Sequence, residues 1–178
     1  LLIDPTSSYA QAAAMAMGRA MDDVIIAAAT GTAYTGETGA TSESVQTAIA
    51  ASVGTGTGLN LVKLTTAKRL LDDADVDPSI PRHIIVGPEQ LQNLLAVEQV
   101  TSSDYNTVKA LVQGEIDSYL GFKFTVSNRL AKSGNDRTCI VYAEDGITLG
   151  IGKDISARID ERADKSYATQ VYYCQSIG

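Results

Sequence analysis

The opening third of the chain repeats its hydrophobic positions at helical spacing. From about Pro5 to Ala29 apolar residues recur at three- and four-residue steps, while Arg19, Asp22 and Asp23 fall on the opposite side. This period predicts one long helix with a single buried stripe. A left-handed Gly31 is expected to close it. The predicted stripe consists of Ala13, Met17, Ala20, Met21, Val24, Ile25 and Ala28.

A polar connection and a second helix follow. The segment from Gly31 to Gly58 is rich in Gly, Thr and Ser, which predicts a long, exposed connection. Its central VQTAIAASV is compatible with a strand or a short helix. Helical periodicity returns from about Leu59 to Asp75, and prolines end it. The predicted inward positions are Leu61, Leu64, Ala67, Leu70, Leu71 and Ala74.

The middle of the chain predicts a strand, a helix and another strand. HIIVG, residues 83–87, is typical of a buried strand, and the helix expected from Pro88 carries Leu91, Leu94 and Leu95 on one face. The segment VKALVQGEIDSYLG is apolar but ambiguous, whereas FKFTVSN alternates as a half-buried strand does. LAKSGNDRT is a predicted turn.

The last third is strand-like throughout. CIVYA, ITLGI, ISARIDER and KSYATQVYYCQSI each predict a strand, and ERADKS predicts the tip of a long antiparallel hairpin. We expect Ile155, Ala157 and Ile159 on one face of its first strand. Tyr167, Val171 and Tyr173 are expected on one face of its second strand. Helices followed by strands in this order predict an α+β protein with a mainly antiparallel sheet.

The charge and composition of the chain argue against some classes of function. The 178 residues have a formal net charge of −7 and a pI near 4.6, which argues against specific nucleic-acid binding. No apolar run approaches the ~20 residues that cross a membrane, and the opening LLIDPTSSY has no signal-peptide features. Cys139 and Cys174 lie in predicted strands and are interpreted as reduced core thiols of a cytoplasmic protein.

Possible reactive or ligand-binding groups lack the patterns that chemistry requires. His83 is interpreted as a surface or strand-edge residue, because no local motif supplies a nucleophile. GTGTGLN, residues 54–60, and GITLGIGKD, residues 146–154, resemble phosphate loops but lack the required Lys-Ser/Thr pair. The cluster Asp72, Asp73, Asp75 and Asp77 lacks the glycine and glutamate of a calcium loop. We therefore expect no catalytic, cofactor-binding or metal-binding residues.

One charged segment is a candidate for contact between subunits. Positive and negative residues are mixed over the predicted hairpin tip, where a solvated turn is the ordinary interpretation. The alternative is a polar interface whose charges fix orientation more than they add affinity. The candidate residues are Arg158, Asp160, Glu161, Arg162, Asp164 and Lys165.

Several long segments resemble one family in its own order. AMGRAMDDVIIAAATGTAYTGETGATS is similar to the long helix and glycine-rich loop of phage major capsid proteins with the Hong Kong 97-like fold. LTTAKRLLDDADVDPSIPRHIIVGPEQLQNLL resembles the helix, strand and helix that follow. VTSSDYNTVKALVQGEIDSYLGFKFTVSNRL and GIGKDISARIDERADKSYATQVYYCQSIG resemble the approach to the axial lobe and the returning peripheral strands.

The resemblance implies an organisation and a function. Residues 1–87 would form the first part of the peripheral domain, 88–137 the axial domain, and 138–178 axial strands and the return to the peripheral domain. The chain would be a subunit of an icosahedral phage capsid, assembling with itself into hexamers and pentamers around the genome. Scaffold and portal proteins would be further partners. It would be made in the bacterial host cytoplasm and end in the virion.

The chain departs from the family pattern at its ends. The N-terminal arm and extended loop of the family, and its further strand after the final glycine, are not recognisable. The arm and loop would supply much of the contact area, so we expect this fragment to be monomeric or weakly associated, since a stable interface needs over ~1,000 Å². One alternative is an encapsulin-like compartment shell, which gene neighbours would distinguish. Another is an α+β enzyme with an unrecognised site, which mutation of His83 would test.

Overall fold

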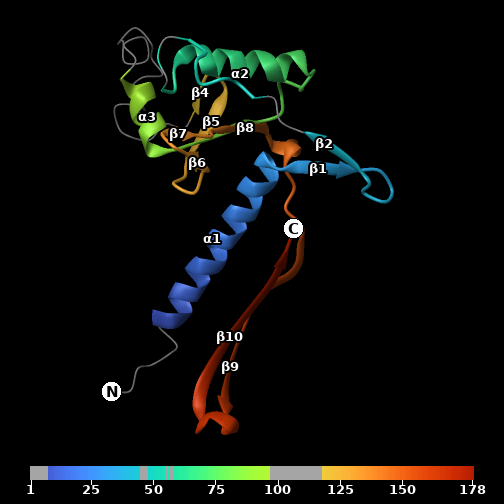
Figure 1. Ribbon diagram of the computed structural model, residues 1–178, viewed down its shortest axis with the longest axis vertical. Helices are drawn as coiled ribbons and strands as arrows, with labels where there is room; N and C mark the ends of the chain where they lie inside the picture. The colour runs from blue at the N-terminus through green and yellow to red at the C-terminus, as the bar shows by residue number, and fades with distance from the viewer. Residues whose placement is uncertain (1–7, 45–47, 55, 57, 97–117) are drawn as a thin grey trace. The chain divides into compact units, whose positions relative to one another are not determined.

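The computed structural model describes residues 8–44, 48–54, 56, 58–96 and 118–178 (Figure 1). The chain divides into two compact units. One comprises Leu1–Ala28 with Thr148–Gly178, and the other comprises Ala29–Ile147. The predicted α+β class is confirmed, because the chain combines helices with strands whose described pairs are antiparallel with one exception.

A mixed four-stranded sheet organises the unit 29–147. Its order is β4 (Ser118–Tyr119), β5 (Phe122–Val126), β3 (Arg82–Val86) and β8 (Ile140–Ala143). The exception is the parallel pair β3 and β5, which requires a crossover connection that includes helix α3 (Pro88–Leu95). β3 is the central strand, with β5 on one side and β8 on the other.

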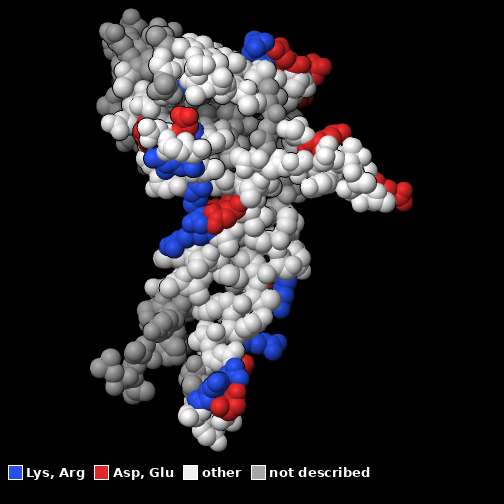
Figure 2. All heavy atoms as spheres, viewed as in Figure 1, with Lys and Arg blue, Asp and Glu red and all other residues white. Residues whose placement is uncertain are grey.

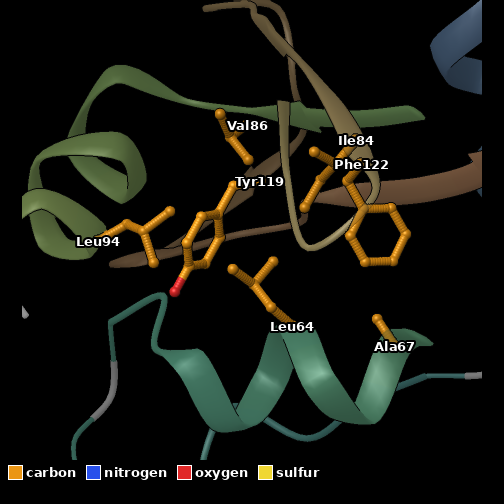
Figure 3. Packing of buried hydrophobic residues seen from close by; sticks show 7 residues of the cluster. All are labelled: Leu64, Ala67, Ile84, Val86, Leu94, Tyr119 and Phe122. Atoms are coloured by element: carbon orange, nitrogen blue, oxygen red, sulfur yellow. The ribbon is translucent and has the colours of Figure 1, made fainter. Parts of the chain in front are cut away.

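The core lies between one face of this sheet and the helices α2 (Leu61–Asp73) and α3 (Figure 3). Phe122 and Val86 are fully buried, and Leu64 and Leu94 reach them from the two helices. Burying such side chains stabilises the fold by about 1.5–3 kcal/mol each. The cluster is Leu64, Ala67, Ile84, Val86, Leu94, Tyr119 and Phe122.

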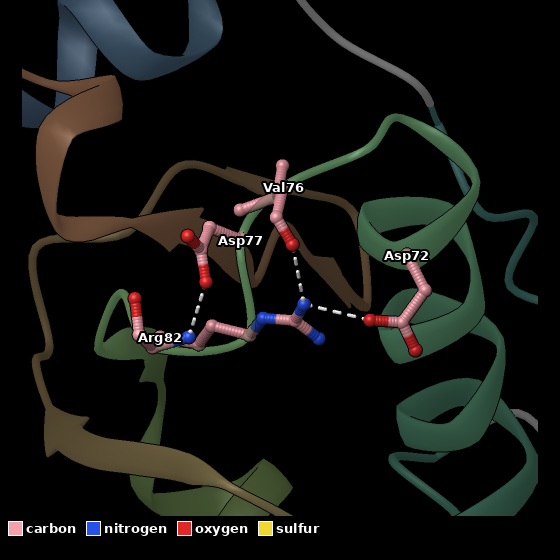
Figure 4. Close-up of polar contacts among 5 residues, drawn as sticks. Asp72, Val76, Asp77 and Arg82 are labelled. Carbon is pink, nitrogen blue, oxygen red and sulfur yellow. Dashed lines mark hydrogen bonds and ion pairs between the residues drawn. The ribbon is translucent and has the colours of Figure 1, made fainter.

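Helix α2 begins and ends slightly inside the predicted range. Asn60 is its N-cap, and the Asn60 side chain accepts a hydrogen bond from the Lys63 backbone N–H at 2.9 Å. The predicted inward positions are buried or half-buried except Ala74, which is exposed because the helix has already ended at Asp73. At the far end of α2, Asp72 forms an ion pair with Arg82 of β3 (Figure 4).

The glycine-rich connection contains a hairpin that the sequence analysis missed. β1 (Thr32–Thr35) pairs with β2 (Thr41–Ser44), and Gly36 and Gly39 adopt positive φ angles in the turn. Thr and Tyr favour strands, but four-residue strands give too short a pattern to recognise. Of VQTAIAASV, residues 45–47 lie outside the described residues, and 48–53 form neither helix nor strand.

The predicted turn in LAKSGNDRT is confirmed as a small hairpin, β6 (Lys132–Ser133) and β7 (Asp136–Arg137), with Gly134 at positive φ. The strand predicted for ITLGI is wrong, because residues 147–150 are irregular and Ile151 already belongs to the next strand. The ambiguous segment VKALVQGEIDSYLG lies outside the described residues up to position 117.

The other unit contains helix α1 (Ser8–Thr30) and the strands β9 (Ile151–Arg162) and β10 (Ala168–Ile177) (Figure 1). The predicted helix is confirmed, and its stripe is half-buried at Ala13, Met17, Met21, Val24 and Ile25. Ala20 and Ala28 are exposed, whereas the unpredicted Ile26 is buried. Gly31 follows the helix, but it does not take the expected left-handed conformation.

Candidate assembly interface

The hairpin β9–β10 has one apolar and one polar face. Ile159 lies opposite Val171 and Ala157 opposite Tyr173, so these residues share a face, as predicted. The other face carries the pairs Arg158 with Tyr172 and Asp160 with Gln170. Tyr167 was predicted on the apolar face, which is wrong: it precedes β10, has φ 59°, and is 73% exposed.

Two bulges preserve the apolar face toward the base of the hairpin. Cys174 pairs with Ser156, but Ser176 pairs with Lys153 and Ile177 with Ile151, so β9 contains extra residues. Each extra residue reverses the alternation of side chains. Lys153 therefore turns to the polar face, and Ile151 returns to the face of Ile177.

A short turn closes the hairpin. The 3-10 helix Ala163–Lys165 follows β9, and Ser166 and Tyr167 then take positive φ angles of 53° and 59°. Left-handed conformations cost non-glycine residues roughly 1–2 kcal/mol. The two left-handed residues close the turn, and Tyr167 is exposed to solvent.

Arg162 and Asp164 form a fork-like ion pair across this turn. Arg162 Nε donates to Asp164 Oδ1 at 2.8 Å, and Nη2 donates to Oδ2. The Arg162 side chain lowers the pKa of Asp164 below its ordinary value, and Asp164 raises the pKa of Arg162. Both groups are exposed, so their main effect is to fix the turn rather than to stabilise the whole protein.

All six predicted interface residues are exposed, four of them on β9 and two in the turn that follows. Figure 2 shows Lys, Arg, Asp and Glu side chains gathered at the end of this hairpin. Arg158, Asp160 and Arg162 alternate along one face of β9, and Glu161 lies on the other face. Asp164 and Lys165 belong to the turn. Their charges sum to zero, with three of each sign, so one copy of the tip can face another copy without net repulsion.

The structure also shows the contacts of His83 and of the aspartates that the sequence suggested as possible catalytic or metal-binding groups. His83 is half-buried on the central strand and stacks on Tyr142 with ring centroids 5.4 Å apart, so the strand-edge interpretation is wrong. Asp72 and Asp73 form ion pairs with Arg82 and Arg69, and Asp77 accepts a hydrogen bond from the Ser79 backbone.

The two glycine-rich segments lie in different parts of the fold. Gly54 adopts a positive φ before the cap of α2, and residues 55 and 57 lie outside the described residues. Gly152 is inside β9. A hollow of about 550 Å³ lies between Lys68, Asp72 and Leu120. In the described part of the chain, no group of three or more His, Cys, Asp or Glu residues is placed to hold a metal ion.

No helix in the described ranges has the length and hydrophobicity needed to span a membrane.

A family model described as phage capsid protein matches residues 1–178. The chain belongs to this family of phage capsid proteins.

A solved structure from Mycobacterium phage Che8 is similar in fold, with a TM-score of 0.69 and 20% sequence identity. The alignment covers 97% of this chain and 58% of the Che8 chain, so this phage capsid protein spans little more than half of that relative. No curated protein matches. The family is one of phage capsid proteins, and it does not favour the compartment shell.

The residue pattern did not single out Tyr172, which is 51% exposed on the polar face of β10. A signal was present, because residues 168–177 contain no charged residue.

Proposed function

We propose that this phage capsid protein has the Hong Kong 97-like fold and assembles with itself into hexamers and pentamers, which close into an icosahedral shell around the genome. The observation that carries the proposal is the long helix combined with a long terminal hairpin in one unit of the chain. Family membership and the similar fold of the Che8 chain support it.

The proposal divides the chain into lobes. Residues 1–87 and the end of 138–178 would belong to a peripheral domain, and 88–137 to an axial domain. Grouping of the first helix with the last strands supports a peripheral lobe made from both ends of the chain. Scaffold and portal proteins are further proposed partners, and synthesis in the bacterial host cytoplasm precedes incorporation into the virion.

The tip residues Arg158 to Lys165 would make polar contacts between neighbouring subunits. An exposed ion pair contributes at most ~1 kcal/mol, so these charges select orientation and act through repetition around a ring. A closed shell can be built from individually weak contacts because each subunit makes many of them.

A charge swap tests the tip contact. We expect Lys165→Glu to weaken self-association of residues 1–178 in sedimentation velocity, and Lys165→Glu with Glu161→Lys to restore part of it. Lys132→Glu, which changes an exposed charge on β6, is the matched control. Equal association of all variants contradicts the proposed contact.

The acidic character suits a wall that encloses DNA without binding it. A net charge of −7 repels phosphates at low ionic strength, where electrostatic effects are strongest. We expect no association with duplex DNA at low salt in a fluorescence anisotropy measurement. Tight binding there contradicts this part of the proposal.

A further inference from the structure

Two polar side chains meet over Gly87, where β3 passes into α3. Gln90 lies in the first turn of α3, and Arg137 is the last residue of β7. A Cβ atom on Gly87 would stand 2.4 Å from Gln90 Oε1 and 2.8 Å from Arg137 Nη1. Atoms do not approach a Cβ that closely, so the missing side chain of Gly87 leaves the space that both residues use.

Each of these side chains holds a buried atom that no hydrogen bond satisfies. Arg137 Nε, a donor, and Gln90 Oε1, an acceptor, have no hydrogen-bond partner in the described part of the chain. Both atoms are enclosed by the chain itself, so a segment from outside could not reach them without opening the structure. An unpaired buried polar atom loses its hydration without compensation. A neighbouring donor and acceptor in this state therefore favour pairing with each other.

The present contact of Arg137 holds its side chain weakly. Arg137 Nη1 donates to Asn128 Oδ1 at 3.4 Å, beyond the usual range of about 2.7–3.2 Å for such bonds. A guanidinium group carries five N–H donors in one plane, so a small rotation can exchange one acceptor for another. Pairing of Arg137 with Gln90 satisfies two buried atoms at the expense of one long bond.

Arg137 also connects a small surface hairpin to the sheet. The strands β6 and β7 have two residues each, and the Thr138 backbone N–H donates to the Ala131 carbonyl at 3.1 Å beside them. Of the four strand residues, three are exposed and Arg137 is half-buried. A hairpin this short depends on contacts outside itself. The place of the Arg137 side chain therefore influences where the hairpin lies.

We propose that Arg137 exchanges between Asn128 and Gln90, and that this exchange moves the β6–β7 hairpin between two positions. In the first position Nη1 donates to Asn128, as in the structure. In the second position Nε donates to Gln90 Oε1, which draws the hairpin toward α3. Two arrangements that differ by one hydrogen-bond partner are close in free energy, as a conformational switch requires.

The exchange has a use in the proposed capsid function, and this use alone rests on that function. A subunit that occurs in both hexamers and pentamers meets its neighbours at two different angles. A surface hairpin with two positions helps one chain to fit both settings.

NMR relaxation dispersion of residues 1–178 tests the exchange directly. We expect motion on the microsecond-to-millisecond timescale at Arg137 Nε and at the backbone amides of Gly134 and Thr138. Gln90→Met keeps the length of the side chain but removes the acceptor, so it should abolish this dispersion. Gln92→Met, at an exposed position of the same helix, is the matched control and should leave the dispersion unchanged.

Gly87→Ala provides a second variant that acts on the same contact. Gly87 has φ −84°, which alanine adopts without strain, so the substitution changes the space between the two side chains. The added methyl group separates Gln90 from Arg137, and the dispersion should again be lost.

The outcomes separate an exchange of Arg137 from a static or water-filled contact. Absence of dispersion at Arg137 in the unmodified chain rejects the exchange, as does dispersion that survives Gln90→Met or is lost equally in Gln92→Met. A crystal structure with one water molecule bonded to both Arg137 Nε and Gln90 Oε1 rejects their direct pairing. Each of these results leaves the capsid function and the tip contact standing, because self-association of the chain measures those separately.

Discussion

Arg82 Nη2 lies 2.6 Å from Asp72 Oδ1, and the same nitrogen donates to the Val76 carbonyl at 3.1 Å. The Arg82 side chain is 7% exposed and that of Asp72 is 48% exposed, so the two ends of the pair differ in environment. The contact joins the end of α2 to the first residue of β3. It holds the covering helix in place on the sheet.

This asymmetry predicts unequal effects of removing either partner. Asp72→Asn leaves a buried cation with only neutral oxygen acceptors, and we expect it to lower the free energy of unfolding by roughly 1.5–3 kcal/mol. Arg82→Met leaves a carboxylate that water can reach, so its effect should be smaller. Urea denaturation measures both. Asp73→Asn, which breaks an exposed pair with Arg69, is the control, and an equal effect of Asp72→Asn and Asp73→Asn contradicts the prediction.

The cap of α2 gives a second prediction. Asn60 accepts from the Lys63 N–H at 2.9 Å and donates to the Val53 carbonyl at 3.1 Å. Asn60→Ala removes both bonds and should destabilise the protein by about 1 kcal/mol. Asn60→Asp keeps the acceptor alone and should retain part of the stability in thermal denaturation. A melting temperature unchanged by Asn60→Ala would show that the cap contributes nothing.

The hairpin tip should respond to acid. The pKa of Asp164 lies below its ordinary value of 3.8 because Arg162 hydrogen-bonds its carboxylate. The folded-state pKa is the lower one, so this contact is fully present above about pH 3.8 and is lost as the pH falls through the folded value. Arg162→Gln should raise the pKa of Asp164 in an NMR titration.

Asp77 is the internal control for that titration. Its pKa is also lowered, but the cause is the backbone N–H of Ser79. Arg162→Gln should leave the Asp77 titration unchanged. A parallel change at both carboxyl groups would indicate a general effect on the protein instead of a local ion pair.

The thiol of Cys139 should react slowly in the folded protein. Burial raises the pKa of Cys139, although the Gly87 backbone and nearby Arg137 and Lys63 partly oppose this. Because the thiolate is the reactive form, Cys139 should be alkylated slowly in the folded protein and rapidly in urea. Mass spectrometry of the Cys174→Ser variant measures this. Rapid labelling of the folded variant would contradict the burial of Cys139.

Secondary structure could be predicted from the sequence where a long segment keeps one hydrophobic period along its whole length. The stripe of α1 and the alternation of Ile159 with Ala157 follow directly from period, and the register confirms the facing pairs of the hairpin. Short elements could not be predicted, because the four-residue strands β1 and β2 have too few positions to show a hydrophobic pattern. Lys153 breaks alternation because a bulge, invisible in sequence, reverses its face.

Only part of the candidate interface could be predicted from the sequence. The six charged residues could be named from their clustering, but the fork between Arg162 and Asp164 depends on the turn that brings them together. The pairing of β10 could not be inferred from its composition alone. An uncharged strand is ordinary inside a sheet, and the strand order shows that, among the described strands, β10 pairs with β9 alone.

The sequence by itself determined the helices, the long hairpin, the acidic character and the resemblance to phage capsid proteins, because these depend on period, charge and residue order. Tertiary structure decided which strands are neighbours, that β3 is central and pairs in parallel with β5, and that Asp72 meets a buried Arg82. These outcomes depend on contacts between residues distant in the chain. Local hydrophobic patterns constrain which face is buried, but they do not specify the partner that buries it.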